Sequence, residues 1–302
     1  MTNVFQKAVR QKSKLRLALM GVSGSGKTYS ALRLAKGLGG KIAFIDTESG
    51  SAQLYSNIAD FDVLELGPPY TPTSYVNAIR AAEEADYEVL IIDSLSHAWA
   101  GEGGVLDRVE KITEASRSKN SFQAWNKGTK EQNMLVDKIL SSNLHVICCI
   151  RSKTAYEIVE DNGKKRPVKF GLAPVQRDNL EYEFSLVMDI SRDNHLATVS
   201  KNRTDLFNDE VPFMITEDTG KQLNKWLDSG IIAPVKKGVD EVIIDKIYKC
   251  NSVTELSTLY KDLATDPATS TWIQDLVGVC AKRKQEILRA EETQLASEDI
   301  QW

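Results

Sequence analysis

The sequence has few cysteines, and their arrangement does not suit a disulfide framework or a zinc site. Four cysteines occur in 302 residues. Cys148 and Cys149 are adjacent inside an apolar run, while Cys250 and Cys280 lie far from them, which is neither a disulfide pattern nor a metal-ligand spacing. The three histidines are scattered along the chain in the same way. Unpaired cysteines of this kind are typical of a reducing cytoplasm.

Long apolar runs and a strong charge of one sign are also missing. No apolar stretch approaches the ~20 residues that a membrane span needs, and the first residues lack a signal-peptide core, so we expect no membrane partner. The formal net charge is -4. Any nucleic-acid site must therefore be a local basic feature of the surface. The length suffices for one good core and a small second unit.

The stretch 15–30, LRLALMGVSGSGKTYS, has the form of a strand, a glycine-rich loop and the start of a helix. Gly21, Gly26, Lys27 and Thr28 fit the pattern G-x-x-x-x-G-K-[ST]. Such a loop points backbone N–H groups at an anion, and the helix adds the positive end of its dipole. Lys27 is expected at the β- and γ-phosphates of ATP, and the Thr28 hydroxyl on Mg²⁺. An ordinary glycine-rich turn is the alternative. The predicted nucleotide-binding residues of this loop are Gly21, Gly24, Ser25, Gly26, Lys27, Thr28 and Tyr29.

Apolar runs alternate with helical patterns after this loop. Residues 41–46, 63–66 and 88–93 are predicted to be buried strands. Strands that alternate with helices form a mostly parallel sheet covered on both faces, with ligands at the carboxyl ends of the strands. Asp93 ends the third run, where its carboxylate can join Thr28 in holding Mg²⁺. An aspartate that only caps a turn is the alternative.

Glu48, just past the second strand, is the candidate catalytic residue. An enzyme that cleaves a γ-phosphate needs a carboxylate or an amide to orient the attacking water. Glu48 lies where the strand beside the phosphate-binding loop is expected to end. Asp46 is closer to the strand and competes for this role, although it could equally bond the backbone of the loop. We favour Glu48.

Three motifs in this order, GVSGSGKT, KIAFIDTE and EVLIIDS, resemble the core of RecA-type ATPases. In that family the glutamate after the second strand is the catalytic base, which implies the same role for Glu48. The resemblance covers about residues 15–215 and implies an α/β fold with a mostly parallel sheet. We therefore expect a basic N-terminal arm at 1–14, a RecA-like P-loop NTPase core at 15–216, and a small helical C-terminal unit with an acidic tail at 217–302.

Residues 101–134 are polar, with basic and aromatic residues interleaved. In RecA-like proteins the first DNA-binding loop follows the strand that corresponds to residues 88–93 and the helix after it. The resemblance therefore implies DNA contact by Trp125 and Lys127. Basic residues hold phosphates, while aromatic rings stack on bases. The alternative is that Trp125 anchors a long loop to the core.

The predicted strand 144–150 leads into Arg151, at the position where RecA-like proteins place a polar sensor of the γ-phosphate. RecA itself typically has glutamine there, so Arg151 departs from the pattern, and its guanidinium can touch phosphate directly. The Asn-Gly turn at 162–163 predicts a hairpin over 156–170. Residues 151–177 hold seven basic and three acidic residues. This arm is our candidate for DNA binding, and a solvated hairpin that contacts a neighbouring subunit is the alternative. Its predicted DNA-binding residues are Lys153, Lys164, Lys165, Arg166, Lys169 and Arg177.

Residues 184–190 and 195–200 are predicted to pair as strands, and the second strand ends in Lys201-Asn202-Arg203. In RecA-like assemblies two cations at this point reach across the subunit interface to the neighbour's γ-phosphate. The resemblance therefore implies catalytic roles for Lys201 and Arg203. It also implies a homo-oligomer, ring or filament, with active sites between subunits. The alternative is an exposed strand end with solvated cations.

The phrases SFQAWNK, GLAPVQRDNLEYEF and KNR are similar to phage RecA-like ATPases associated with single-strand annealing and recombination. The resemblance implies an ATP- and Mg²⁺-dependent ATPase that acts in phage or prophage recombination or repair, in the cytoplasm of a bacterial host cell. Single-stranded DNA, further copies of the chain and a single-strand-binding protein are the implied partners. The alternative is a nucleotide-gated scaffold that docks a replication or packaging partner without touching DNA. A small-molecule kinase is disfavoured, because nothing in the sequence resembles an acceptor lid.

Overall fold

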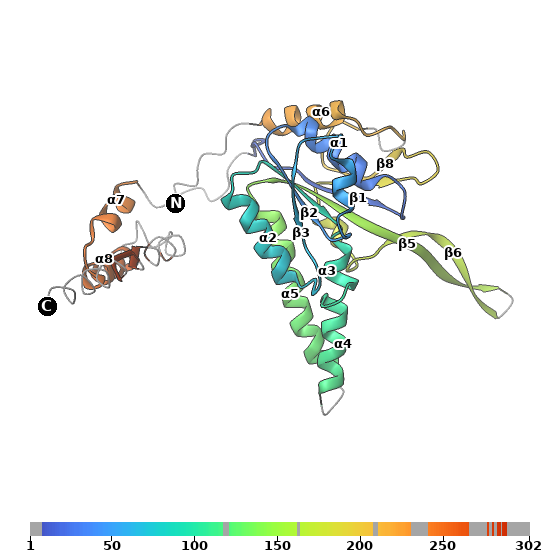
Figure 1. Cartoon of the computed structure of the whole chain (residues 1–302). Coiled ribbons are helices and arrows are strands. Elements are labelled where there is room, and N and C mark those ends of the chain that lie inside the picture. The colour runs from blue at the N-terminus through green and yellow to red at the C-terminus, as the bar shows by residue number, and fades with distance from the viewer. Residues whose placement is uncertain are drawn as a thin grey trace. The chain divides into compact units, whose positions relative to one another are not determined.

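The structure is a computed structural model that describes residues 8–116, 121–161, 164–207, 211–230 and 241–265, together with 277, 280, 283–284 and 286–288. For 155–161, 164–170, 241, 242 and 244 it describes the backbone alone. The chain divides into two compact units, residues 1–231 and 232–302. The first unit contains the sheet and the glycine-rich loop (Figure 1).

A mostly parallel β-sheet forms the centre of the first unit. Its strands lie in the order β3-β2-β4-β5-β1-β7-β8, and β6 pairs with β5 outside this row. Neighbours in the row are parallel except β8, which runs antiparallel to β7. The predicted α/β fold is therefore confirmed. The strands are β1 Arg16–Gly21, β2 Ile42–Asp46, β3 Asp62–Glu65, β4 Val89–Asp93, β5 His145–Asp161, β6 Lys164–Pro174, β7 Leu186–Ile190 and β8 Ala197–Asn202.

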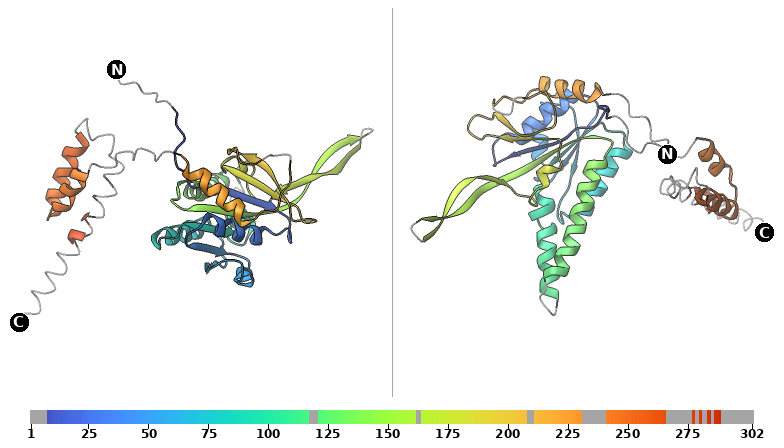
Figure 2. Two further views of the ribbon diagram at one scale, coloured as in Figure 1. Left: turned by 90° about the horizontal axis from the view of Figure 1, so that it is seen from above. Right: turned by 180° about the vertical axis from the view of Figure 1, so that it is seen from behind.

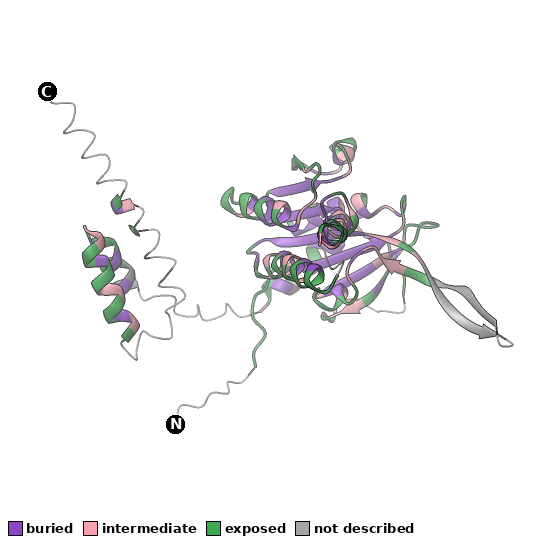
Figure 3. Cartoon of the chain, turned by 90° about the horizontal axis from the view of Figure 1, so that it is seen from below, coloured by how far each residue is buried: buried purple, intermediate pink, exposed green. Residues whose placement is uncertain are grey.

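Helices cover both faces of the sheet, because successive strand residues point to opposite sides. On one face Leu17 of β1 lies in a buried cluster with Leu32 of α1 and Leu223 of α6. On the other face Ala18 lies with Ile79 of α2, and α5 packs beside α2. Figure 3 shows that the sheet and the helix sides facing it are buried. None of the described helices is long and apolar enough for a membrane span. The helices of this unit are α1 Lys27–Leu38, α2 Pro72–Glu84, α3 Ser96–Ala100, α4 Val105–Ala115, α5 Ser121–Ser141 and α6 Glu217–Asp228, with 3-10 turns η1 Ser51–Tyr55 and η2 Leu180–Tyr182.

Helix α6 lies in the first unit, although the sequence assigned residues from 217 onward to the C-terminal helical unit. It packs on α1 through two glycines. A Cβ atom at Gly37 would lie 2.0 Å from the backbone oxygen of Glu217, and one at Gly220 would lie 2.3 Å from that of Leu34. The two helix backbones therefore approach so closely that only glycine fits at these positions.

We expect Gly220→Ala to lower the free energy of unfolding by about 2 kcal/mol. Overpacking costs up to about 3 kcal/mol where the new atom meets backbone, and the higher helix propensity of alanine, ~1 kcal/mol, offsets part of it. Urea denaturation measures the change. Gln222→Ala, on the exposed side of α6, is the control and should shift the value by less than about 0.5 kcal/mol. A shift equally small for Gly220→Ala would mean that the two helices are not in backbone contact.

The basic N-terminal arm, described from Ala8 onward, also reaches α6. The Arg10 guanidinium lies 4.7 Å from the centre of the Trp226 ring, and Lys12 pairs with Asp228 at 3.3 Å. These contacts connect residues before the first strand to the end of α6. Residues 1–7 lie outside the described part of the chain.

Two long elements project from the sheet (Figures 1 and 2). Helices α4 and α5 form a hairpin across much of residues 101–134, where the sequence had suggested a long polar loop. Gly128 allows their close approach, because a Cβ atom there would lie 2.7 Å from Val109 Cγ2. The second element is an arm in which β5 continues beyond the sheet and β6 returns antiparallel to it. The predicted hairpin is therefore confirmed, with residues 162–163 of its turn outside the described part.

His145, buried at the start of β5, is expected to make stability depend on pH. Burial, with Lys14 and Arg16 nearby, lowers the pKa of His145 to about 4, and its Nδ1 accepts the N–H of Leu15 at 3.2 Å. In the unfolded chain the pKa of His145 returns to about 6.5. Between pH 6.5 and pH 4 the unfolded chain therefore binds more protons than the folded chain, so the free energy of unfolding falls as the pH drops through this window.

Across that whole window, the titration of His145 lowers the free energy of unfolding by about 3 kcal/mol. His145→Asn keeps an acceptor near the position of Nδ1 and removes the titration. Urea unfolding at pH 7 and pH 5 should therefore show a smaller loss on acidification for His145→Asn than for the wild type. Equal losses in the two proteins would contradict the assignment.

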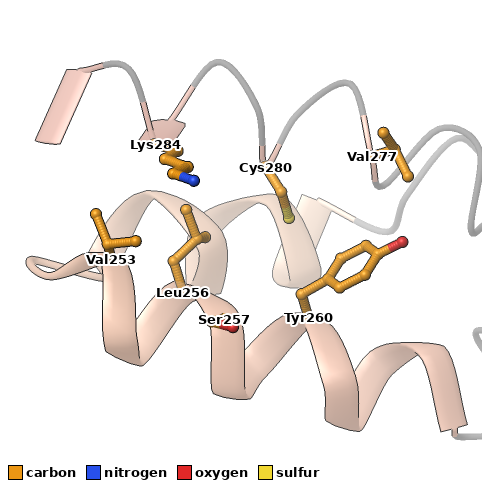
Figure 4. A pocket seen from close by; sticks show the side chains of 7 residues that line it. All are labelled: Val253, Leu256, Ser257, Tyr260, Val277, Cys280 and Lys284. Atoms are coloured by element: carbon orange, nitrogen blue, oxygen red, sulfur yellow. The ribbon is translucent and has the colours of Figure 1, made fainter. Parts of the chain in front are cut away.

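The second unit contains helices α7 Glu241–Lys249 and α8 Val253–Thr265. Ile247 and Leu256 are buried in its small apolar core. A cavity of about 340 Å³ lies between α8 and residues farther along the chain (Figure 4). Its lining residues are Val253, Leu256, Ser257, Tyr260, Val277, Cys280 and Lys284.

Candidate nucleotide-binding site

The glycine-rich loop joins β1 to α1 at the carboxyl edge of the sheet, as predicted. Gly26 has a φ of 96°, a left-handed conformation that favours glycine, and α1 begins at the next residue. Lys27 is buried, and its Nζ donates to the backbone oxygens of Gly21 and Val22, each at 3.0 Å. A Cβ atom at Gly21 would lie 2.4 Å from Ser25 Oγ, so this glycine is needed for packing. The loop brings a helix N-terminus and a lysine to one point, which is the composition of an anion site.

Thr28 and Asp93 meet beside this loop. The Thr28 hydroxyl donates to Asp93 Oδ2 at 2.6 Å. Asp93 ends β4 and is 3% exposed, and burial, with the charge of Glu48 nearby, raises its pKa to about 6. A hydroxyl and a carboxylate side by side are hard oxygen donors of the kind that Mg²⁺ binds, together with waters and phosphate oxygens. The residues present therefore fit a magnesium ion, which Thr28 and Asp93 would hold.

Asp46, the competitor of Glu48 in the sequence, has a structural role. It is 1% exposed at the end of β2. Its two carboxylate oxygens accept the backbone N–H groups of Glu48 at 2.6 Å and of Ala52 at 3.0 Å. Asp46 thus fixes the backbone of the segment that follows β2. Of the two competing acids, Glu48 lines the cavity described below and Asp46 does not.

Glu48 forms an ion pair with Arg151. The Arg151 Nε and Nη2 atoms donate to Glu48 Oε1 at 3.0 and 2.7 Å. Glu48 follows β2 and Arg151 lies on β5, and β4 lies between these two strands. The pair is partly exposed, with 32% of the Glu48 side chain and 44% of the Arg151 side chain accessible. The predicted catalytic glutamate and the predicted phosphate sensor are therefore in direct contact, which the sequence did not indicate.

One cavity of about 510 Å³ gathers most of the predicted site. Leu54 and Tyr55 of η1 also line it and were missed, although they follow Glu48 closely in the sequence, where a local search could have found them. Tyr29 is not among the described residues that line the cavity, and its hydroxyl accepts a hydrogen bond from Arg33 at 3.1 Å. The lining residues are Ser23, Gly24, Gly26, Lys27, Thr28, Glu48, Ser51, Leu54, Tyr55, Asp93, Arg151, Ser152 and Val175.

The turn between β7 and β8 reaches the glycine-rich loop and adds two residues that the sequence did not suggest. His195 Nδ1 lies 3.0 Å from the backbone oxygen of Ser25. A Cβ atom at Gly24 would lie 4.0 Å from Arg192 Nε. Because β7 pairs with β1, its carboxyl end lies next to the loop. Only the strand order reveals this proximity.

Lys201 and Arg203 lie at the amino ends of the parallel strands, whereas the glycine-rich loop lies at their carboxyl ends. Since β8 is antiparallel to β7, its end lies beside the start of β7, and the Arg203 N–H donates to the backbone oxygen of Ser185 at 3.0 Å. Lys201 Nζ donates to the backbone oxygens of Glu181, at 3.1 Å, and Tyr182. Burial and the Arg203 charge lower the pKa of Lys201. Neither cation lines the cavity formed by the described residues of its own chain.

The predicted DNA-binding residues are spread over the two projecting elements. Trp125 and Lys127 are exposed on α5, and the Trp125 ring lies 6.2 Å from that of Trp99. Lys153 is exposed on β5 near the base of the arm. Arg177, just after β6, donates to the side-chain oxygen of Asn133 on α5 at 3.2 Å. The side chains of Lys164, Lys165, Arg166 and Lys169 lie outside the described part of the structure.

The fold and this loop define a P-loop nucleotide-binding protein. A family model described as an AAA domain matches residues 13–208, more than half of the chain, and the chain therefore belongs to this family. The match includes the glycine-rich loop, both acids of the cavity and the β5–β6 arm, and an AAA domain indicates nucleotide binding and hydrolysis. A comparison with curated proteins gave no match.

Proposed function

We propose that the protein is an ATP- and Mg²⁺-dependent ATPase that binds single-stranded DNA, assembles with further copies of itself and acts in phage or prophage DNA recombination or repair. The observation that carries this proposal is the continuity of β5. The strand begins at His145 in the sheet, passes the cavity at Arg151 and ends at Asp161 in the arm. Nucleotide contacts and DNA contacts would then share one rigid element.

The charge of the arm supports DNA as its ligand. Residues 151–177 hold seven basic and three acidic residues in a chain whose net charge is -4. Lysine and arginine bind nucleic-acid phosphates without regard to sequence, with an affinity that falls as salt rises. Exposed Trp125, on the helix that contacts the base of the arm through Asn133, offers a ring on which a base can stack.

In the proposed mechanism, each group of the site has a role in hydrolysis. Lys27 and the N-terminus of α1 bind the β- and γ-phosphates. Thr28 and Asp93 would hold Mg²⁺, which would supply charge neutralisation during phosphate cleavage. Glu48 orients the attacking water and takes up its proton. Lys201 and Arg203 act on the nucleotide of a neighbouring copy. This role agrees with their position away from the cavity of their own chain.

The test is a triple variant of the arm, Lys164→Ala with Lys165→Ala and Arg166→Ala. Losing three phosphate contacts should weaken binding to a poly-dT oligonucleotide at least tenfold, and should lower the slope of log affinity against log salt by roughly 2. Fluorescence anisotropy at several salt concentrations measures both quantities.

The control is Lys221→Ala with Lys225→Ala, two exposed lysines of α6, which should leave DNA binding unchanged. An arm variant that binds DNA as tightly as the wild type would contradict the proposed interface. ATP hydrolysis by a wild type that neither binds DNA nor responds to it would favour the nucleotide-gated scaffold instead.

A further inference from the structure

His97 of α3 bonds to the residue that precedes the proposed catalytic acid. Its ring nitrogen Nδ1 lies 2.7 Å from the hydroxyl oxygen of Thr47, and Glu48 is the next residue of the chain. Thr47 is 3% exposed, and His97 is half-buried. His97 is not among the described residues that line the nucleotide cavity. Its connection to the site therefore runs through Thr47.

The Thr47 hydroxyl joins the ends of two neighbouring strands. Its oxygen accepts the backbone N–H of Ser94 at 2.8 Å, and Ser94 directly follows Asp93 at the end of β4. The backbone N–H of Thr47 donates to the carbonyl oxygen of Asp93 at 2.8 Å. Because the hydroxyl oxygen accepts from Ser94, its own proton is available to His97. The hydroxyl therefore helps to fix the backbone from which Glu48 extends.

The His97 ring is suited to accept that proton. Burial, with the Arg151 charge nearby, lowers the pKa of His97. The imidazole is therefore neutral at pH 7, and one of its ring nitrogens is an acceptor. The Tyr70 ring stacks on it with 4.9 Å between the ring centres, and Tyr70 Oη donates to the backbone oxygen of Thr47 at 3.4 Å. These contacts hold the imidazole in one orientation toward Thr47.

The segment that carries His97 is held at the two residues before it. The Leu95 carbonyl oxygen accepts a side-chain N–H of Gln176 at 3.1 Å, and Ser96 Oγ accepts the backbone N–H of Arg151 at 2.9 Å. Gln176 follows β6, and Arg151 lies where β5 leaves the sheet for the arm. His97 is thus a fixed support against which Thr47 is held.

His97 also lies at the base of the α4–α5 hairpin. Its backbone oxygen accepts the Gly101 N–H at 2.9 Å. A Cβ atom at Gly101 or at Gly104 would lie 2.7 Å from that same oxygen, so the connection between α3 and α4 packs directly on His97. Figure 1 shows α3 between the sheet and this hairpin. The hairpin is thereby connected to the Glu48 segment by way of His97.

We propose that His97 is a positioning residue, which holds Glu48 in line for hydrolysis through the Thr47 hydroxyl and connects the α4–α5 hairpin to that alignment. A misplacement of about 1 Å at a reacting group can cost about a hundredfold in rate. Nucleotide binding depends on Lys27 and the glycine-rich loop and does not need this bond. DNA on the hairpin would act on hydrolysis through the same contact. This inference rests on the proposed function, since it needs Glu48 to act on water.

The first test separates turnover from binding. His97→Leu removes the acceptor and should lower kcat for ATP by about ten- to a hundredfold, with KM within about twofold of the wild type. His97→Asn keeps an acceptor near the position of Nδ1 and should recover most of the turnover. Arg80→Ala, exposed on α2, is the matched control and should keep the wild-type kcat. Steady-state hydrolysis by the full chain measures these values, and thermal melting shows that each variant is folded.

A double variant tests whether the two residues act as one unit. Thr47→Val removes the hydroxyl from a side chain of similar shape and should also lower kcat. Because both substitutions break the same bond, Thr47→Val combined with His97→Leu should be as slow as Thr47→Val alone. A poly-dT oligonucleotide should bind His97→Leu as tightly as the wild type but stimulate its hydrolysis less.

Four results would overturn the inference. One is a wild-type kcat in His97→Leu. Another is an equal loss of kcat in His97→Asn and His97→Leu with a lower melting temperature in both, as expected of a merely structural residue. The third is a double variant in which the two losses multiply, and the fourth is full stimulation of His97→Leu by poly-dT. A wild type that hydrolyses no ATP contradicts the proposed function itself, which distinguishes the two failures.

Discussion

Arg203→Ala is expected to lower kcat for ATP hydrolysis by about a thousandfold, because an arginine supplied by a neighbouring subunit typically contributes 10³–10⁵ in rate. Arg203 is exposed at the edge of the sheet opposite the glycine-rich loop, so it cannot serve the cavity of its own chain. The loss should appear in kcat with little change in nucleotide affinity. Steady-state hydrolysis and nucleotide titration separate the two quantities.

Mixing two inactive variants tests whether the cation acts between subunits. A Glu48→Gln protomer still carries Arg203, and an Arg203→Ala protomer still carries Glu48. Where the two meet in an assembly, one site regains both groups, so the mixture should hydrolyse ATP faster than either variant alone. Arg80→Ala, an exposed arginine on α2, is the matched control and should retain full activity. An Arg203→Ala protein as active as this control would refute the role in trans.

Glu48→Gln is expected to reduce kcat by roughly 10²–10⁴, the usual contribution of a positioned general base, while ATP remains bound. Glutamine keeps the size of the side chain and removes the charge that takes up the proton. Asp46→Asn provides the contrast, because Asp46 accepts two backbone N–H groups and its loss should reduce stability. Single-turnover hydrolysis and thermal melting of both variants measure these effects. Glu48→Gln with wild-type turnover would remove Glu48 from the mechanism.

The glycine-rich loop and the acid at the end of β4 could be predicted because both depend on local spacing. Gly21 to Thr28 form one motif in eight consecutive residues. Asp93 ends a short apolar run rich in β-branched residues, which favours a buried strand. Because parallel strands end at the same edge of a sheet, Asp93 is expected next to Thr28. In the structure, the Thr28 hydroxyl oxygen lies 2.6 Å from Asp93 Oδ2.

Contacts created by strand order could not be predicted in this way. Glu48 and Arg151 are 103 residues apart. They meet because β2 and β5 lie on either side of β4. His195 meets Ser25 for the same kind of reason, since β7 pairs with β1. A single sequence shows that each strand exists but not which strands become neighbours.

The α4–α5 hairpin escaped prediction because of its composition. The surface with which α5 meets α4 includes Ala124 and Gly128, whose small side chains give a weak helical periodicity. A glycine in a polar stretch usually indicates a loop. Here Gly128 allows α5 to approach α4 closely. This role becomes visible only once α4 is known to pack against α5.

We propose that this chain cleaves ATP at the cavity between its glycine-rich loop and Glu48, and does so in response to single-stranded DNA. The most direct measurement is the rate of ADP formation by the wild type and by Lys27→Ala, each with and without a poly-dT oligonucleotide at low salt. We expect hydrolysis by the wild type that rises when DNA is added, and none above background for Lys27→Ala. A wild-type rate equal to that of Lys27→Ala in both conditions would contradict it.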